Sequence, residues 1–141
     1  MIKNLKYVIN SMEDLKTHLY SRIPFYSTLG LELLEIGNGR ASFEISIHQE
    51  LTQNGNLHGG VIASLIDSAC ACAAISIIYP DGYITTIDLQ VEFLKPVSKG
   101  KLIGKAKCIK AGKNIFFCKA KVWDENNNLI STGSSQLLRI S

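Results

Sequence analysis

The chain has 141 residues and a mass of 15.5 kDa, which is the size of one domain. Apolar residues make up 46% and charged residues 19%, a globular composition that excludes intrinsic disorder. The net charge of +3 is too small to indicate a nucleic-acid partner, and no Lys/Arg run concentrates it, although it favours a small anionic ligand.

We expect a cytoplasmic protein, because the first residues lack a signal peptide's apolar segment. The four cysteines do not have the spacing of a metal site, and we expect them to be reduced thiols in the core. They are Cys70, Cys72, Cys108 and Cys118.

The N-terminal segment predicts one short helix. Ser11, with an acidic residue three positions later, fits a helix-capping box, and apolar residues recur at helical spacing across 12–20. Pro24 prevents this helix from extending further. We therefore divide the chain into an N-terminal helical segment, 1–24, and a main domain, 25–141.

Six strands are predicted in the main domain. Alternating apolar and polar residues, bounded by turn residues, mark them. The first two are joined by Gly37-Asn38-Gly39, a hairpin signal. The expected strands are 31–36, 40–47, 83–93, 102–109, 115–123 and 129–140. No helix separates the last four, so the sheet should be antiparallel and the fold class α+β.

One long helix is predicted at 59–78, between the second and third strands. It is apolar on all sides, and Asp67 is its single charged residue. Its length also fits a membrane span, but a carboxylate near the middle of a span costs about 2.5–3.5 kcal/mol. Small residues along the helix suit close packing against a sheet. We therefore expect a core helix and no membrane.

The beginning of this helix is the most informative segment for chemistry. Gly59 and Gly60 follow His58, so the first N–H groups of the helix lack both intrahelical acceptors and covering Cβ atoms. Such an end binds an anion or an oxyanion, although two glycines also suit a tight turn without any ligand. His58 fits a hydrogen bond to the backbone as well as an acid–base role. Asp67 should face a polar pocket or a partner chain, or be protonated, unless its role is purely structural.

Three motifs in order resemble those of the hotdog-fold acyl-CoA thioesterases. They are Gly-Asn-Leu-His-Gly-Gly-Val-Ile-Ala-Ser-Leu-Ile-Asp at 55–67, Thr-Thr-Ile-Asp-Leu-Gln-Val-Glu-Phe-Leu-Lys-Pro at 85–96, and Lys-Ala-Gly-Lys-Asn at 110–114. The resemblance runs from about Phe25 to Ile140 and is strongest to the phenylacetate-degradation (PaaI-like) branch of the 4-hydroxybenzoyl-CoA thioesterase superfamily.

The resemblance implies a curved antiparallel sheet wrapped around a central helix. It also implies a homodimer with a continuous sheet and active sites between protomers, assembled as a dimer of dimers, that is, a homotetramer. The substrate would be an acyl-CoA, with neither a metal nor an organic cofactor. The Gly59 N–H would bind the thioester carbonyl, Asp67 would activate water or attack directly, and His58 would polarise the site. Thr86 falls where the family has a hydroxyl near the water.

Further residues are assigned to substrate binding by the same resemblance. Lys110, Gly112, Lys113 and Asn114 fall where the family holds the CoA nucleotide, although two lysines in a turn also fit a simple solvated surface. Asp88 and Phe93 lie on the strand beside it, and Gly60 belongs to the glycine pair at the helix start. Thr52 departs from the family pattern of Asn or Gln, with Gln53 and Asn54 adjacent.

These observations predict an enzyme that hydrolyses an acyl thioester to a carboxylic acid and free CoA. A non-catalytic acyl-CoA sensor is the alternative, but such regulators usually carry a DNA-binding module, and 1–24 provides only one short helix. A hotdog dehydratase is a second alternative, which would need a Glu on the central helix that we do not find.

Overall fold

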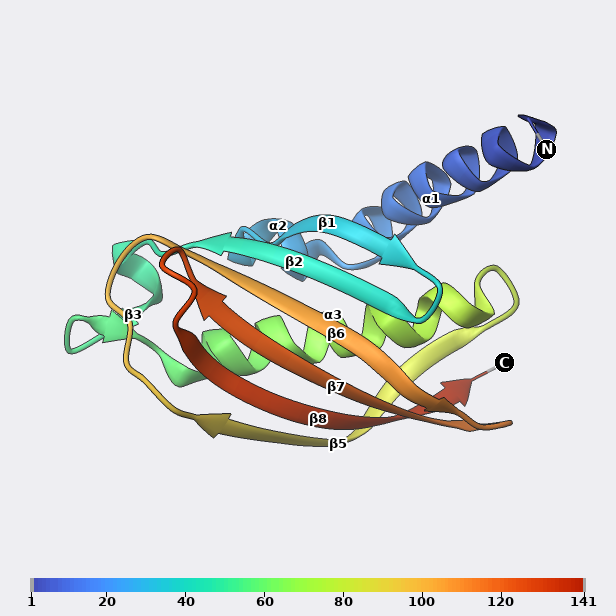
Figure 1. The fold of residues 1–141 in the computed structure, drawn as a ribbon. Coiled ribbons are helices and arrows are strands. Elements are labelled where there is room, and N and C mark those ends of the chain that lie inside the picture. The colour runs from blue at the N-terminus through green and yellow to red at the C-terminus, as the bar shows by residue number, and fades with distance from the viewer. Residues whose placement is uncertain (1, 141) are drawn as a thin grey trace.

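The computed structural model describes residues 2–140, with side chains from Met12 to Ile140. Its helices and strands lie in a single sheet-and-helix body, from which the N-terminal helix projects (Figure 1). The elements are α1 (Ile2–Arg22), α2 (Pro24–Leu29), β1 (Glu32–Gly37), β2 (Arg40–Ser46), a 3-10 helix (Gln49–Leu51), β3 (Thr52–Gln53), β4 (Asn56–Leu57), α3 (Gly59–Ile78), β5 (Tyr83–Phe93), β6 (Lys101–Ala111), β7 (Ile115–Asp124) and β8 (Leu129–Ile140).

The main sheet has six strands in the order β1-β2-β6-β7-β8-β5, and every neighbouring pair is antiparallel. The sheet curves around α3, which lies across its inner face (Figure 1). This is the hotdog fold, so the predicted α+β class, the six strands and the central helix are confirmed. The first and last strands in this order, β1 and β5, form the two edges of the sheet.

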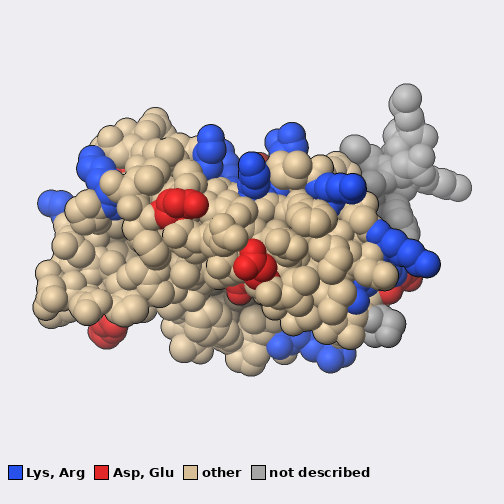
Figure 2. All heavy atoms as spheres, turned by 90° about the horizontal axis from the view of Figure 1, so that it is seen from below, with Lys and Arg blue, Asp and Glu red and all other residues tan. Residues whose placement is uncertain are grey.

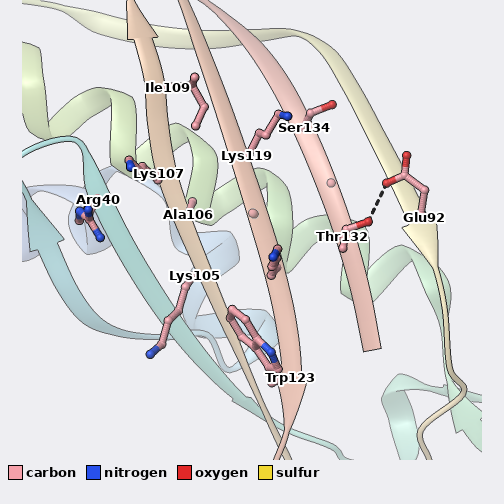
Figure 3. Close-up of a pocket in the computed structure, with 13 residues that line it drawn as sticks. Arg40, Glu92, Lys105, Ala106, Lys107, Ile109, Lys119, Trp123, Thr132 and Ser134 are labelled. Atoms are coloured by element: carbon pink, nitrogen blue, oxygen red, sulfur yellow. Dashed lines mark hydrogen bonds between the residues drawn. The ribbon is translucent and has the colours of Figure 1, made fainter. Parts of the chain in front are cut away.

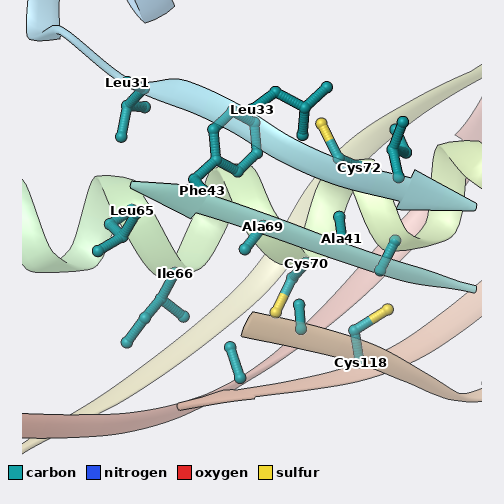
Figure 4. Packing of buried hydrophobic residues seen from close by; sticks show 14 of the residues in the cluster. Leu31, Leu33, Ala41, Phe43, Leu65, Ile66, Ala69, Cys70, Cys72 and Cys118 are labelled. Atoms are coloured by element: carbon teal, nitrogen blue, oxygen red, sulfur yellow. The ribbon is translucent and has the colours of Figure 1, made fainter. Parts of the chain in front are cut away.

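Two glycines of the sheet let α3 pack closely against it. A Cβ on Gly104 would lie 2.9 Å from Cγ of Leu65, and a Cβ on Gly133 would lie 2.8 Å from Cγ2 of Ile66. Leu65 and Ile66 are fully buried, and Figure 4 shows their side chains among those of the neighbouring strands. By length and hydropathy α3 could cross a membrane, but 61% of its apolar window is buried inside the molecule. The apolar surface of α3 is therefore that of a core helix.

The four cysteines are free thiols, and three of them are buried in this core. Burial, reinforced by the negative charge of Asp67, raises the pKa of Cys70 to about 12. Burial likewise raises the pKa of Cys72 to about 12. Cys70 and Cys72 therefore stay protonated at neutral pH, as expected of core thiols, whereas Cys108 is only half-buried.

The N-terminal helix is longer than the predicted 12–20. The structure begins α1 at Ile2, so the predicted start at Ser11 is wrong; the side chain of Ser11 lies outside the described residues. Apolar residues at helical spacing continue upstream through Ile2, Leu5 and Ile9, and this periodicity outweighs a local capping signal. Pro24 stops α1 as predicted and occupies the first turn of α2.

Candidate active site

The α3 N-terminus is capped by His58. The Nδ1 atom of His58 accepts a 2.8 Å hydrogen bond from the N–H of Gly60, and its carbonyl accepts one of 3.0 Å from Val61. His58 is therefore a helix cap bonded to the backbone, one of the two readings that its sequence context allowed. Within residues 2–140 no acceptor is found for the N–H of Gly59, the first residue of the helix. One amide at the positive end of the helix dipole remains free to bind a carbonyl or anion.

A groove of about 350 Å³ lies beside Gly59. The ring of Phe93 forms one side of it: a Cβ on Gly59 would lie only 3.2 Å from Cε1 of that ring. A side chain at this position would need the Phe93 ring to shift by a few tenths of an ångström, and no positive φ calls for a glycine here. The full lining is Asn56, Leu57, Gly59, Ile62, Phe93, Leu94, Lys95, Pro96 and Val97.

The small hairpin β3–β4 stands directly before α3. Asn54 and Gly55 form its turn, both with positive φ. The hydroxyl of Thr52 donates a 2.6 Å hydrogen bond to the carbonyl of Gln49, while Gln53 and Asn54 are exposed. The hairpin is tied to the segment after β5 by a 2.7 Å bond from the Leu57 N–H to the Val97 carbonyl. The structure thus holds the predicted residues 52–54 near the start of α3.

Asp67 and Thr86 meet between α3 and β5. The Thr86 hydroxyl donates a 2.7 Å hydrogen bond to Oδ1 of Asp67. Both side chains are half-buried. A bulge in β5 follows Thr86, so Asp88 lies on the outer face, where it lines a smaller pocket of about 170 Å³ with Gln90 and Ile109. Of the residues on β5 assigned to the site, only Thr86 therefore contacts Asp67.

The remaining predicted residues lie apart from these two within one chain. Gly59 and Asp67 are eight residues apart on one helix, which at 1.5 Å per residue separates them by roughly 12 Å. Lys110, Gly112, Lys113 and Asn114 lie around the β6–β7 turn, at the opposite end of the molecule from the start of α3 (Figure 1). Gly112 is required there, because a Cβ would lie 2.7 Å from the Ile115 carbonyl.

The sequence reasoning missed a cluster of cations on the outer face of the sheet. No contiguous run of Lys or Arg concentrates charge, yet the fold gathers five cations around a groove of about 570 Å³ (Figure 3). The sequence does contain an indication of this cluster: lysines occur at alternating positions, and alternating residues share one face of a strand. We call this set the outer basic patch; it consists of Arg40, Lys105, Lys107, Lys119 and Lys121.

The described side chains contain no group of three or more His, Cys, Asp or Glu placed to hold a metal ion. The groups available for chemistry in this part of the chain are a free amide at a helix start, a carboxylate hydrogen-bonded to a hydroxyl, and lysines at a hairpin.

Comparison with known proteins identifies the family. A family model described as "Thioesterase superfamily" matches residues 54–131. The Mycobacterium tuberculosis protein named "Putative esterase Rv1847" is 25% identical over 119 residues, covering 82% of this chain and 85% of that protein. Its structure matches with a TM-score of 0.80 over 84% of this chain and 97% of that chain.

Two further solved structures are similar. Thioesterase HI1161 from Haemophilus influenzae has a TM-score of 0.78 and 26% identity, covering 82% of each chain. The E. coli PaaI protein of the phenylacetic acid degradation operon matches with a TM-score of 0.83, covering 89% of this chain and 91% of that chain; at 19% identity it shows the fold alone. The family model spans more than half of the chain, including Gly59, Asp67 and Thr86. The chain therefore belongs to the thioesterase superfamily, which supports thioester hydrolysis as its general chemistry.

Proposed function

We propose that the protein hydrolyses acyl-CoA thioesters to a carboxylic acid and free CoA. The observation that carries the proposal is the hydrogen bond from Thr86 to Asp67, since it orients the only carboxylate of a core helix whose first amide, at Gly59, is free. An amide donor and an oriented carboxylate are the two groups that hydrolysis of an acyl group requires.

In this mechanism the Gly59 N–H donates to the thioester carbonyl oxygen, which becomes an oxyanion when the carbon is attacked. A single donor of this kind contributes about 2.7–4 kcal/mol in comparable acyl-transfer sites. Asp67 takes a proton from the attacking water, and the carbon–sulfur bond then breaks so that CoA leaves as the thiolate, which is protonated afterwards. Direct attack by Asp67 is the variant mechanism, through an anhydride that water then cleaves.

We propose a homodimer because one chain cannot bring these groups together. Reacting atoms must approach within about 3–3.5 Å, whereas Gly59 and Asp67 of one helix are roughly 12 Å apart. Antiparallel pairing of two β5 edges about a two-fold axis would place the Phe93 end of one strand beside the Thr86 end of the other. The Gly59 of one protomer would then face the partner's Asp67.

The surface around β5 supports this pairing. β5 is an 11-residue strand at the edge of the sheet, so one side of its backbone has no partner strand among residues 2–140. Phe93 and Leu94 at its end are 57% and 55% exposed, and Ile87 is 51% exposed. Figure 2 views the molecule from below, the side on which β5 lies in Figure 1, and most of that face is uncharged. A largely uncharged face with exposed apolar residues is typical of an interface between copies.

The same two-fold arrangement brings the partner's β6–β7 turn toward the Gly59 end of the first protomer. Lys110 and Lys113 are both exposed there, and we propose that they bind the CoA phosphates, with Gly112 and Asn114 shaping the turn. Nearer the acyl end, the substrate would contact Thr52, Gln53, Asn54, Gly60 and Phe93, and His58 would help to shape and polarise the site. Asp88 is left out of this site, because it lies on the outer face of the sheet. A dimer of dimers, a cytoplasmic location and catalysis without metal or cofactor belong to the same proposal.

The test is a panel of acyl-CoAs of different chain length, mixed with the purified protein and a thiol-reactive dye. Wild-type protein should release free CoA in proportion to enzyme concentration, and the Asp67→Asn variant should not. Binding of acyl-CoA without release of thiol from any member of the panel would contradict hydrolysis and indicate a sensor.

A further inference from the structure

The outer basic patch is organised as two rows that cross the sheet. In the first row Arg40 lies opposite Lys107, and Lys107 lies opposite Lys119. In the second row Lys105 lies opposite Lys121. Neighbouring strands are about 4.8 Å apart and successive residues on one face about 6.7 Å apart. The five side chains therefore start from an area of the backbone of roughly 10 by 7 Å, on the face away from α3.

Like charges directly opposite each other on a sheet are destabilising. The structure contains three such pairs in the patch, and no acidic side chain among the described residues forms a salt bridge with any of its five members. The one ion pair found among those residues, Lys101 with Glu44 at 3.0 Å, lies outside the patch. An arrangement that breaks a local rule of stability without compensation points to a function.

The surroundings of the patch limit the size of what it could bind. Beyond Lys121 the second row continues through Thr132 to Glu92, and the Thr132 hydroxyl donates a 3.0 Å hydrogen bond to the Glu92 carboxylate. At the other end the Lys105 ammonium lies 6.0 Å from the centre of the Trp123 ring. The positive area is thus closed by a carboxylate on one side and an aromatic ring on another, as Figure 3 shows.

We propose that the outer basic patch binds a compact anion carrying two or more phosphate groups. The groove of about 570 Å³ has a volume within the range of small-molecule sites. A nucleic-acid strand would need a positive stripe that continues beyond the groove, and Glu92 interrupts it. A second copy of the same face would bring cations against cations. Clustered phosphates instead neutralise both rows, and charge-assisted hydrogen bonds from Arg and Lys hold them.

This site is separate from the proposed active site, because its side chains lie on the sheet face opposite α3 and Asp67. Anion binding at the outer basic patch can therefore be tested independently of thioester hydrolysis. The phosphate groups could belong to an inorganic polyphosphate or to a nucleotide, and these two sources are separated by using inorganic triphosphate and ATP as probes.

The experiment is calorimetric titration of the full chain with inorganic triphosphate, with ATP, and with a single-stranded 20-nucleotide DNA. The double variant Lys107→Gln/Lys119→Gln removes the centre of the first row, and both side chains are exposed, so the fold should be kept. Lys16→Gln/Lys99→Gln makes the same change of charge at exposed positions that do not line the groove. Each removed contact is a charge-assisted one, so affinity for triphosphate should fall about tenfold or more in the first variant and less than about twofold in the control.

Two further results are expected. Without ligand, the Lys107→Gln/Lys119→Gln variant should have a higher Tm than wild type, because two like-charge pairs are relieved. Triphosphate should raise the Tm of wild type more than that of this variant.

Any of three results would overturn the proposal. The two double variants could weaken the binding of triphosphate equally, or wild type could fail to bind triphosphate at about 1 mM. The third such result is tighter binding of the DNA than of triphosphate and ATP. Tighter binding of ATP than of triphosphate would identify a nucleotide as the source.

Discussion

The hydroxyl of Thr86 donates a 2.7 Å hydrogen bond to Oδ1 of Asp67 and so joins β5 to the middle of α3. This bond occupies one oxygen of the carboxylate and leaves Oδ2 to accept a proton. It also fixes the direction in which Oδ2 points, since rotation of the carboxylate would break the bond. In the proposed mechanism Thr86 is therefore a positioning residue for Asp67.

Replacing Asp67 with Asn should lower kcat by at least ~10²-fold, the usual size of a general-base effect, with little change in Tm. Thr86→Val should lower kcat by a smaller factor, about tenfold, with KM nearly unchanged, because it removes only the orienting bond. Thr86→Ser keeps the hydroxyl and should restore most of the activity. Steady-state kinetics of the three variants check this. Near-normal kcat in Asp67→Asn would exclude the proposed role, and equal loss in Thr86→Val and Thr86→Ser would exclude positioning through the hydroxyl.

The double variant Lys110→Ala/Lys113→Ala should raise KM for acyl-CoA about tenfold or more, because charge-assisted contacts to phosphate are lost. A truncated thioester without the nucleotide should be hydrolysed as well as by wild type. Comparison of kcat/KM for the two substrates gives the answer. If both substrates lose equally, the lysines do not bind phosphate.

Complementation tests whether each site is built from two chains. Gly59→Pro removes the amide donor, and its backbone is compatible with proline, because His58 is extended at φ −62° and ψ 134° and proline is favoured at the first helical position. Asp67→Asn keeps the amide but lacks the base. Mixed and allowed to exchange, the two inactive proteins should form about half hybrid dimers, each with one intact site of two, and recover about a quarter of wild-type activity.

The control for this experiment is Gly59→Ala, which keeps the N–H but places a Cβ against Phe93, 3.2 Å from its ring. Activity retained in Gly59→Ala and lost in Gly59→Pro assigns the effect to the amide. If native mass spectrometry detects hybrids while activity stays at baseline, the two-chain site is wrong.

Gly133→Ala should destabilise the fold by about 1–3 kcal/mol, the usual cost of overpacking a core. The new Cβ would lie 2.8 Å from Cγ2 of Ile66 and 2.9 Å from the carbonyl oxygen of Gln90, and a backbone atom cannot turn aside as a side-chain end can. Urea unfolding measures the change. Ser134→Ala, one residue away on the outer face, should stay within about 0.5 kcal/mol of wild type; an equally mild Gly133→Ala would show that α3 does not rest on this glycine.

Asp124 should stabilise the β7–β8 turn in a pH-dependent way. Hydrogen bonds from the side chain and backbone N–H of Asn128 hold the pKa of Asp124 below its usual value of 3.8. The unfolded chain therefore binds the proton first as pH falls, so the stabilisation is complete above pH 3.8 and is lost as pH drops below it. The Tm difference between wild type and Asp124→Ala should shrink between pH 6 and pH 3. A constant difference would contradict this linkage.

Much of the fold was predictable because alternation and helical spacing are local signals. The six strands follow from period-two alternation, and α3 follows from an apolar run that no strand could accommodate. The start of α1 was not predicted, because the capping signal at Ser11 is only one contribution among several to where a helix begins.

Candidate residues for the site could be proposed from the sequence, but their contacts could not. The sequence predicts that Asp67 lies on the central helix and Thr86 on a strand, but their contact depends on the position of β5 along the axis of α3. The outer basic patch was missed for a related reason: which lysines become neighbours depends on the register between β6 and β7, and no single strand determines that register.

The period-two pattern of β7 makes this strand intolerant of changes in length. Lys119 and Lys121 point outward, while Cys118, Ala120 and Val122 between and beside them are buried against α3. Deleting one residue within the strand would turn the two ammonium groups into the core and the apolar side chains into water. Insertions and deletions should therefore be tolerated at the exposed turn of Asn54 and Gly55 and rejected within β7, where one residue decides which side of the sheet carries the charge.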